Sequence, residues 1–205
     1  MRVPVKEDDM SVPRRRILRQ LALAAALILG PAGTVAAGTL AAGPAAATAA
    51  SDCRTAWGSL VERQAPRATG EVTGVRSGRH RCFDRLVIDV GAGEARPGFR
   101  VEYVDTVRKD GSGAEVALRG GARLSVVVVA PAYDEQGRAT YQPADRRELV
   151  DVTGYDTFRQ VAWAGTFEGR TTVGLGVRAR LPMRAFTLTD AEGASRVVVD
   201  VAHSW

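Results

Sequence analysis

The residue types of a serine hydrolase triad lie together at the C-terminal end, in the segment Asp200-Val201-Ala202-His203-Ser204-Trp205. Such a triad would perform acyl transfer, with the serine as nucleophile, the histidine as base and the aspartate orienting the histidine. The segment continues a predicted β-strand, on which Asp200 and His203 point to opposite faces because side chains alternate. The chain end is also a poor place to fix a nucleophile. We therefore expect no triad here.

Other motifs with a defined chemistry do not occur in the sequence. It contains no Gly-x-Ser-x-Gly elbow, no His-Glu-x-x-His pair, no Walker loop and no EF-hand loop. The segment Asp134-Glu135-Gln136-Gly137 offers too few oxygen ligands for calcium. With 2 histidines and 2 cysteines in the chain, a Cys/His zinc site is not expected. We predict no metal, no cofactor and no enzyme activity. The alternative is a hydrolase whose two carboxylates meet only in the folded chain.

The two cysteines, Cys53 and Cys82, are an even set, which in an exported chain suggests a disulfide between them. The closed loop of about 30 residues would constrain the unfolded chain by about 3 kcal/mol. This bond would tether the N-terminal segment, residues 51–69, to the rest of the domain. A free catalytic thiol is the alternative interpretation.

Residues 131–157 interrupt the β pattern with a long connection, and long connections in compact domains often carry function. The segment contains Tyr133, Tyr141 and Tyr155 among charged residues. Tyrosines can contact a ligand while their hydroxyls stay hydrated. Alternatively, the segment is an Ω-loop that its tyrosines pack onto the fold.

A hairpin is predicted around the turn Glu168-Gly169. Counting back from this turn places Trp163 opposite Gly174, on a face that also carries Gly176. The indole either covers weak strand glycines or forms an aromatic platform for a sugar ring. The candidate binding residues come from this hairpin and from the long connection: Tyr133, Tyr141, Tyr155, Trp163, Arg159 and Arg178.

The elements that must position these residues are predicted to be strands. Residues 99–104 alternate between apolar and polar side chains, and residues 124–130 form a continuous apolar run that predicts a strand buried on both faces. Residues 107–118 predict a hairpin around Asp110-Gly111-Ser112-Gly113. The other predicted strands are residues 85–90, 159–167, 170–181, 184–189 and 196–202.

Eight or nine such strands predict an all-β fold, either an antiparallel β-sandwich or a partly open barrel. A short N-terminal helix, tethered by the disulfide, is predicted over residues 55–64. The segments Arg85-Leu86-Val87-Ile88-Asp89-Val90 and Arg196-Val197-Val198-Val199-Asp200-Val201 repeat one pattern. They are either equivalent strands of two sheets or a coincidence in a chain rich in valine and arginine.

The first 50 residues have the features of an export signal. A basic stretch, Arg14-Arg15-Arg16-Ile17-Leu18-Arg19, precedes an apolar run over residues 21–29, and Ala47-Thr48-Ala49-Ala50 supplies small residues for signal peptidase. The arginine pair fits the twin-arginine route as well as the general secretory route. An uncleaved anchor is the alternative, although a membrane span needs about 20 strongly apolar residues. We divide the chain into a signal sequence (1–50), the tethered segment (51–69) and a β domain (70–205).

The charge distribution argues against nucleic acid as a partner. Of the 28 basic and 23 acidic residues, six and three lie in residues 1–50, which leaves 22 basic and 20 acidic residues for the exported part. The net charge of the exported part is therefore +2, whereas the whole chain has +5. We expect no nucleic-acid partner and only a transient contact with the membrane during export.

The predicted strands resemble those of the AMIN-like domain proteins of actinobacteria, which are related to the AMIN envelope-targeting domain. The matching residues are Cys82-Phe83-Asp84-Arg85-Leu86-Val87-Ile88-Asp89, Gly98-Phe99-Arg100-Val101-Glu102-Tyr103-Val104, Leu118-Arg119-Gly120-Gly121-Ala122, Phe158-Arg159-Gln160-Val161-Ala162-Trp163-Ala164-Gly165, Thr172-Val173-Gly174-Leu175-Gly176-Val177-Arg178, Phe186-Thr187-Leu188 and Arg196-Val197-Val198-Val199-Asp200-Val201. The resemblance implies a small β-sandwich in the cell envelope, where AMIN domains occur beside amidases and secretins and are taken to bind peptidoglycan. No binding residue is transferred, because the matching motifs are strands of the core.

Two functions are therefore expected. The first is a non-catalytic envelope domain, secreted or associated with the envelope outside the cytoplasmic membrane, that binds peptidoglycan or another wall component. The alternative is an adaptor or inhibitor that binds an envelope protein through residues 131–157 or through an exposed strand edge. The partner is accordingly a cell-wall glycan or an envelope protein, and we expect the chain to be monomeric.

Overall fold

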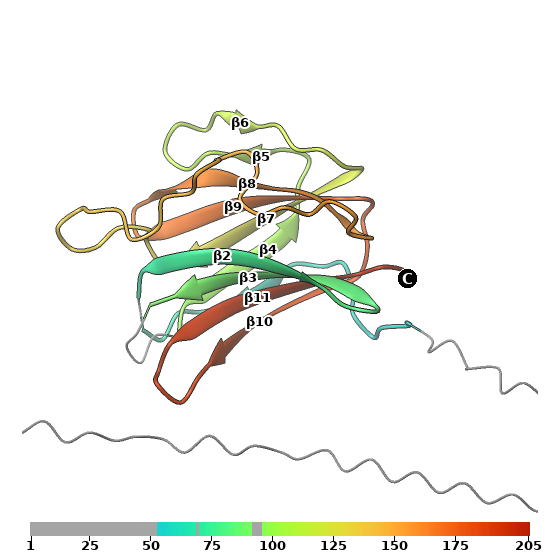
Figure 1. Cartoon of the computed structure of the whole chain (residues 1–205), viewed down its shortest axis with the longest axis horizontal. Helices are drawn as coiled ribbons and strands as arrows, with labels where there is room; N and C mark the ends of the chain where they lie inside the picture. The colour runs from blue at the N-terminus through green and yellow to red at the C-terminus, as the bar shows by residue number, and fades with distance from the viewer. Residues whose placement is uncertain (1–52, 69, 92–95) are drawn as a thin grey trace, which may run out of the picture. The chain divides into compact units, whose positions relative to one another are not determined.

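The computed structural model describes residues 53–68, 70–91 and 96–205, and these contain strands and no helix. A five-stranded sheet in the order β1-β4-β7-β9-β8 faces a four-stranded sheet in the order β10-β11-β3-β2, and a hairpin of β5 and β6 lies outside the first sheet (Figure 1). The strands are β1 (Glu62–Gln64), β2 (Val72–Arg79), β3 (Phe83–Val90), β4 (Gly98–Tyr103), β5 (Val107–Arg108), β6 (Glu115–Val116), β7 (Ala122–Val129), β8 (Phe158–Phe167), β9 (Arg170–Val177), β10 (Met183–Thr189) and β11 (Ser195–Ala202).

The core lies between the two sheets because alternate residues of each strand point inward. Strand β3 contributes Leu86, Ile88 and Val90, and its neighbours and the facing sheet contribute equally buried side chains. Each fully buried aliphatic side chain stabilises the fold by about 1.5–3 kcal/mol relative to exposure. The other inward residues at the centre include Val197, Val199, Val201, Leu124, Val126, Val128, Val173 and Leu175.

The predicted all-β sandwich is confirmed, and the described strands do not close into a barrel. The part of the chain that the structure describes contains eleven strands, whereas the sequence predicts eight or nine. Strand β2 escapes the prediction because its sequence mixes glycine and polar residues and its pairing with β3 contains a register shift between Val72 and Gly74. Strand β7, predicted to be buried on both faces, instead alternates buried and half-buried residues.

The helix predicted over residues 55–64 is wrong. The segment is extended: Gly58 forms a bridge with Met183, and β1 then pairs with β4. Leu60 and Val61 of this segment are 78% and 42% exposed. A helix this short is marginal by itself, so the backbone partners offered by the two sheets determine the conformation.

The repeated Arg-x-Val-x-Asp pattern belongs to one sheet and not to two. Strands β3 and β11 are antiparallel neighbours, and Arg85 pairs with Asp200, Val87 with Val198 and Asp89 with Arg196. The two copies of the repeat therefore pair with each other, related by a local two-fold axis. Of the two interpretations of the repeat, the one that places the segments in two different sheets is wrong.

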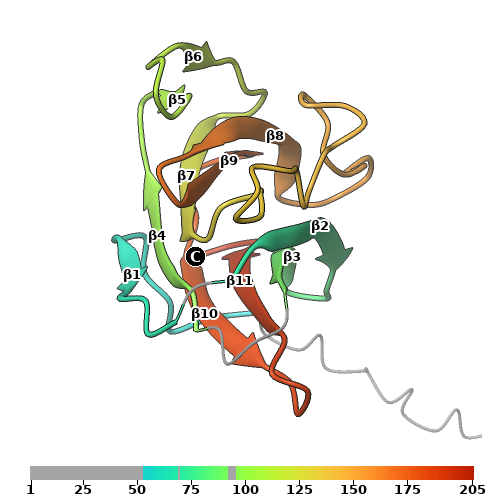
Figure 2. The same cartoon turned by 90° about the vertical axis from the view of Figure 1, so that its left-hand side faces the viewer.

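Residues 131–157 connect β7 to β8 without a strand of their own, and they run along β8, the edge strand of its sheet (Figure 2). The amide of Leu149 donates to the carbonyl of Val161 over 2.8 Å, and the amide of Trp163 donates to the carbonyl of Arg146 over 2.7 Å. The connection thus covers a strand edge that would otherwise be open to pairing with another chain.

The β5–β6 hairpin packs on the outer face of the five-stranded sheet. Val107, Val116 and Leu118 form a second apolar cluster with Ala162 and Ala164 of β8. Gly174 and Gly176 of β9 permit this close approach. A Cβ atom on Gly176 would lie only 2.0 Å from the carbonyl oxygen of Arg119.

The predicted signal sequence lies outside the described residues. Among the described residues, none belongs to a helix with the length and hydropathy of a membrane span.

Candidate functional site

A groove of about 880 Å³ lies over the outer face of β8, and we call it the β8 groove. Its floor is formed by Gln160, Ala162 and Ala164. One wall is residues 115–119, which comprise β6 and the three residues after it, and the other is residues 145–148 of the long connection. The volume lies in the range of sites that bind small molecules.

The side chain of Gln160 fastens both walls to the floor. Its amide oxygen accepts a hydrogen bond from the backbone amide of Arg119 at 2.8 Å, and its amide nitrogen donates to the carbonyl of Arg147 at 3.0 Å. Gln160 is only 6% exposed, so both groups would be costly to leave without a partner. The groove is therefore preformed by the fold.

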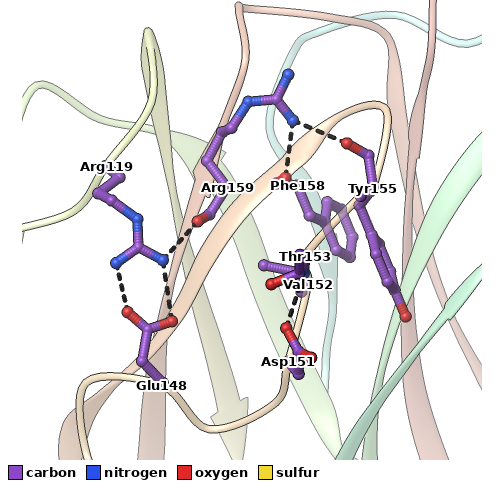
Figure 3. Close-up of a pocket in the computed structure, with 9 residues that line it drawn as sticks. Arg119, Glu148, Asp151, Val152, Thr153, Tyr155, Phe158 and Arg159 are labelled. Carbon is purple, nitrogen blue, oxygen red and sulfur yellow. Dashed lines mark hydrogen bonds and ion pairs between the residues drawn. The ribbon is translucent and has the colours of Figure 1, made fainter.

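Arg119 and Glu148 join the two walls at one end of the groove through a paired guanidinium and carboxylate (Figure 3). The second guanidinium nitrogen of Arg119 also donates to the carbonyl of Arg159 at 2.9 Å. The hydrogen bond to Glu148 raises the pKa of Arg119 further above its ordinary value. Because both side chains are well exposed, the pair closes the groove end more than it stabilises the fold.

The lining combines an apolar floor with charges of both signs. Beyond the Arg119–Glu148 pair, the charged residues are Lys109, Glu115, Asp145, Arg146 and Arg147. The two arginines are exposed, and Gln160 and Trp163 contact their backbone carbonyls. Such a surface fits a ligand with methyl or acetyl groups, amides and carboxylates.

A smaller hollow of about 310 Å³ continues beyond the ion pair, where Asp151 and Arg159 line it (Figure 3). The hydroxyl and the backbone amide of Thr153 donate hydrogen bonds that lower the pKa of Asp151. A glycosidase acid requires the opposite, a carboxyl whose pKa is raised. Since Glu148 is paired with Arg119, this hollow does not have the features of a carboxylate pair for hydrolysis.

The three tyrosines of the long connection are half-buried and attach it to the sandwich. The Tyr133 hydroxyl accepts from the amide of Gly169 at 3.2 Å, and the Tyr155 hydroxyl lies 3.0 Å from the Ser77 hydroxyl. Tyr141 packs on the core against Trp163, with ring centroids 5.5 Å apart. These contacts match the Ω-loop interpretation of the segment.

Trp163 does not lie opposite the strand glycines, so neither predicted role of its indole, as cover of the glycines or as a platform for a sugar ring, fits the structure. The turn and the pairs Phe167–Arg170 and Gly165–Thr172 are as predicted, but the register shifts between Trp163 and Gly165. Trp163 therefore pairs with Val173, and its side chain turns into the core, where it is 9% exposed. The extra residue of a β-bulge reverses the faces to which the following side chains point. The predicted pairing assumed a regular ladder without a bulge.

Arg159 and Arg178 meet at the end of the long connection. Arg159 donates to the carbonyls of Tyr155 and Phe158 at 3.0 and 2.8 Å. Arg178 donates to the carbonyls of Asp156 and His203 at 3.3 and 2.5 Å. Of the six candidate binding residues, the structure thus brings Arg159, Arg178 and Tyr155 together at this end, packs Tyr141 against Trp163 at the core, and places Tyr133 beside Gly169.

Asp84, Asp156 and His203 offer ligand atoms that all lie within 4.8 Å of one another, the one such group among the described residues. Asp84 is fully buried, and one of its oxygens accepts from the amides of Thr157 and Phe158 at 2.7 and 2.9 Å. Its other oxygen lies 3.2 Å from the Nε2 atom of His203. Because these contacts satisfy Asp84, the group already serves to join the long connection to the C-terminal end.

The predicted disulfide joins Cys53 to Cys82, with the Cα atoms 5.1 Å apart. It tethers the N-terminal segment beside β3, where Trp57 contacts the edge of the Phe83 ring at a centroid distance of 5.6 Å.

The residues that build the groove, Gln160 and Arg119, were not among the predicted site residues. The available signal was weak: Gln160 is a polar residue inside an apolar strand, and Arg119 precedes two glycines. Their partners lie 13 to 41 positions away in the sequence, so only the fold brings them together.

Comparison with known proteins identifies one family. A model of the AMIN-like domain family matches residues 70–203. Neither the curated proteins nor the solved structures give a significant match.

Proposed function

We propose, since the chain belongs to the AMIN-like domain family, that it is an exported, non-catalytic domain of the cell envelope that binds peptidoglycan or another wall glycan. The family suggests association with the envelope, and the disulfide is consistent with a location outside the cytoplasm. The observation that carries the proposal is the β8 groove, with its preformed walls and mixed lining.

The lining supports a wall component as the ligand. Ala117, an exposed residue of one wall, offers apolar surface to the acetyl and methyl groups of amino sugars and short peptides, while Ala162 and Ala164 lie buried beneath the β5–β6 hairpin. Arg146 and Arg147 would receive the carboxylates of such peptides through charge-assisted hydrogen bonds. The tyrosines attach the long connection to the sandwich, where it forms one wall of the groove. This arrangement favours the groove as the recognition surface over a connection that binds a protein partner as a free arm.

The absence of catalysis is part of the proposal. Of the carboxylates that line the groove and the adjoining hollow, Glu115 and Asp145 lie on opposite walls of the groove. Glu148 is paired with Arg119, and the pKa of Asp151 is lowered. A general acid for glycoside hydrolysis needs a carboxyl that is protonated near neutral pH, and these two surroundings favour ionised carboxylates.

A sedimentation assay with purified cell wall tests the proposal. We expect the wild-type full chain to sediment with the wall, and the double variant R146E/R147E to lose about tenfold or more in affinity, because each changed arginine replaces an attractive contact with a repulsive one. The matched control is R63E/R67E, which makes the same charge change at exposed positions near β1.

Recovery of the wild-type chain entirely in the supernatant would contradict the proposal. So would an equal loss of binding in R63E/R67E, because the wall would then be sensing net charge and not the groove. Release of soluble sugars or peptides from the wall during the assay would contradict the non-catalytic part.

A further inference from the structure

A second hollow, of about 260 Å³, lies on the opposite outer face of the sandwich, over the four-stranded sheet. We call it the arginine basin and define it by Arg76, His80, Arg85, Val87, Arg196 and Val198. Three arginines and a histidine line it, and no carboxylate does, whereas the β8 groove is lined by charges of both signs.

The repeated Arg-x-Val-x-Asp pattern builds this basin. At its centre, Val87 pairs with Val198 across β3 and β11, and both point outward yet are only 6% and 1% exposed. Arg76 of β2 and Phe186 of β10 occupy the same row on either side. The long arginine stems cover the valines, so the floor is apolar and the rim is made of guanidinium groups.

The carboxylates on this face hold the arginines from the side. Arg76 donates through Nε and Nη2 to Asp89 at 2.8 and 2.9 Å, and Arg85 donates through the same atoms to the fully buried Asp200 at 2.6 and 2.9 Å. These pairs fix the orientation of the guanidinium groups. Each guanidinium has five N–H donors, so such a pair leaves donors for a further acceptor.

Arg196 adds an unpartnered donor. Its Nη2 atom donates to Asp190 at 2.9 Å, but its Nε atom is buried and has no hydrogen-bond partner among the described residues. Native proteins seldom leave a buried donor without an acceptor, and such a donor often marks a functional position. Thus the basin combines oriented cationic donors, a buried N–H without an acceptor and an apolar floor.

We propose that the arginine basin binds an acidic saccharide, that is, a sugar ring carrying a carboxylate or a phosphate. The rim donates to the oxyanion, and the apolar stems of the arginines that cover Val87 and Val198 receive the apolar face of the sugar. This site is separate from the β8 groove, so it can hold or fail independently of the proposed function.

Isothermal titration of the full chain with four probes tests the inference. N-acetylmuramic acid is compared with N-acetylglucosamine, which lacks its carboxylate, and glucose 6-phosphate is compared with glucose. We expect one or both acidic sugars to bind and both neutral sugars to fail. The acid that binds identifies the source of the oxyanion as carboxylate, phosphate or either. Raising the salt concentration weakens this binding.

Variants locate the site. R196Q and R76Q each weaken binding of the acidic sugar about tenfold, because each removes a charge-assisted hydrogen bond. The matched control is R138Q, which removes an exposed arginine paired with Asp134 at 2.7 Å in the long connection, and it leaves binding unchanged. Arg85 is left intact because it holds the buried Asp200.

Three results would overturn the inference: failure of both acidic sugars to bind, equal binding of a neutral sugar, or undiminished binding by R76Q and R196Q. Thermal unfolding of each variant shows whether it is folded. If R196Q is unfolded, R76Q alone tests the site. R146E/R147E serves as a further control. It retains acidic-sugar binding even though it loses wall binding, so failure of the basin is distinguishable from failure of the β8 groove.

Discussion

Gln160 is the residue on which the shape of the β8 groove depends most directly, because one buried amide contacts both walls. Few other side chains could replace Gln160 at this position. Its oxygen and nitrogen serve opposite roles, so no apolar side chain and no single acceptor reproduces both contacts.

We therefore expect Gln160→Leu to lower the free energy of unfolding by about 2 kcal/mol, because the amide of Arg119 and the carbonyl of Arg147 lose their partner. Urea unfolding of the full chain measures this change. Gln136→Leu, at an exposed position of the long connection, is the control and should change stability by about 0.5 kcal/mol or less. Equal stability of the two variants would show that the two hydrogen bonds of Gln160 do not stabilise the fold.

The two aspartates of the repeated pattern differ in burial and so in their expected importance. Asp200 is fully buried between Arg85 and Arg184, whereas Asp89 is 30% exposed beside Arg76. Asp200→Ala should destabilise the fold by about 3 kcal/mol, since it leaves guanidinium groups over a buried position without their counter-charge. Asp89→Ala should cost about 1 kcal/mol or less. Chemical denaturation of both variants checks the order, and a larger loss in Asp89→Ala would contradict it.

At the scale of elements, the bulge in β8 determines which side chains face the core and which face the groove. It directs Trp163 inward and leaves Ala162 and Ala164 on the groove floor. A strand without the bulge would expose the indole and bury the alanines beneath the other sheet. The small floor residues give the groove its depth.

Trp163→Ala is accordingly expected to destabilise the fold by about 3–5 kcal/mol through loss of core packing. Trp205→Ala provides the control, because Trp205 is 66% exposed and makes one hydrogen bond, to the carbonyl of Arg180, so it should cost about 1 kcal/mol or less. Guanidinium unfolding followed by fluorescence measures both. A loss of stability in Trp163→Ala no larger than that in Trp205→Ala would mean that the indole lies on the surface, as regular pairing from the Glu168-Gly169 turn predicts.

The N-terminal segment depends on a covalent tether. We expect Cys53→Ser with Cys82→Ser to lower the free energy of unfolding by about 3 kcal/mol, mainly by freeing the unfolded chain. Reductant should have the same effect on the wild-type chain and none on the double variant. If the double variant is as stable as the oxidised wild-type chain, the tether is not a source of stability.

Much of this element-level arrangement could be predicted. Period-two alternation located most of the strands, the Glu168-Gly169 turn set the end of one hairpin, and the cysteine pair indicated the disulfide. The bulge, the extended residues 55–64 and the partners of Gln160 could not be predicted, because each depends on backbone groups supplied by distant strands. Local pattern determines which strands form, and tertiary pairing determines their register.

At the scale of the molecule, the two sheets present different outer faces. One face has a deep groove between two added walls, and the other has a shallow basin covered by arginines. A sandwich of this kind can present two polar recognition surfaces without weakening the core between them, because alternate residues of the same strands serve each purpose.

Hydrogen–deuterium exchange of the full chain, with and without solubilised wall fragments, tests the central claim most directly. If the β8 groove binds the wall, exchange should slow in residues 115–119 and 145–149, and R146E/R147E should abolish this protection while R63E/R67E retains it. Unchanged exchange in both walls at a saturating concentration of fragments, or protection confined to other segments, would contradict the account.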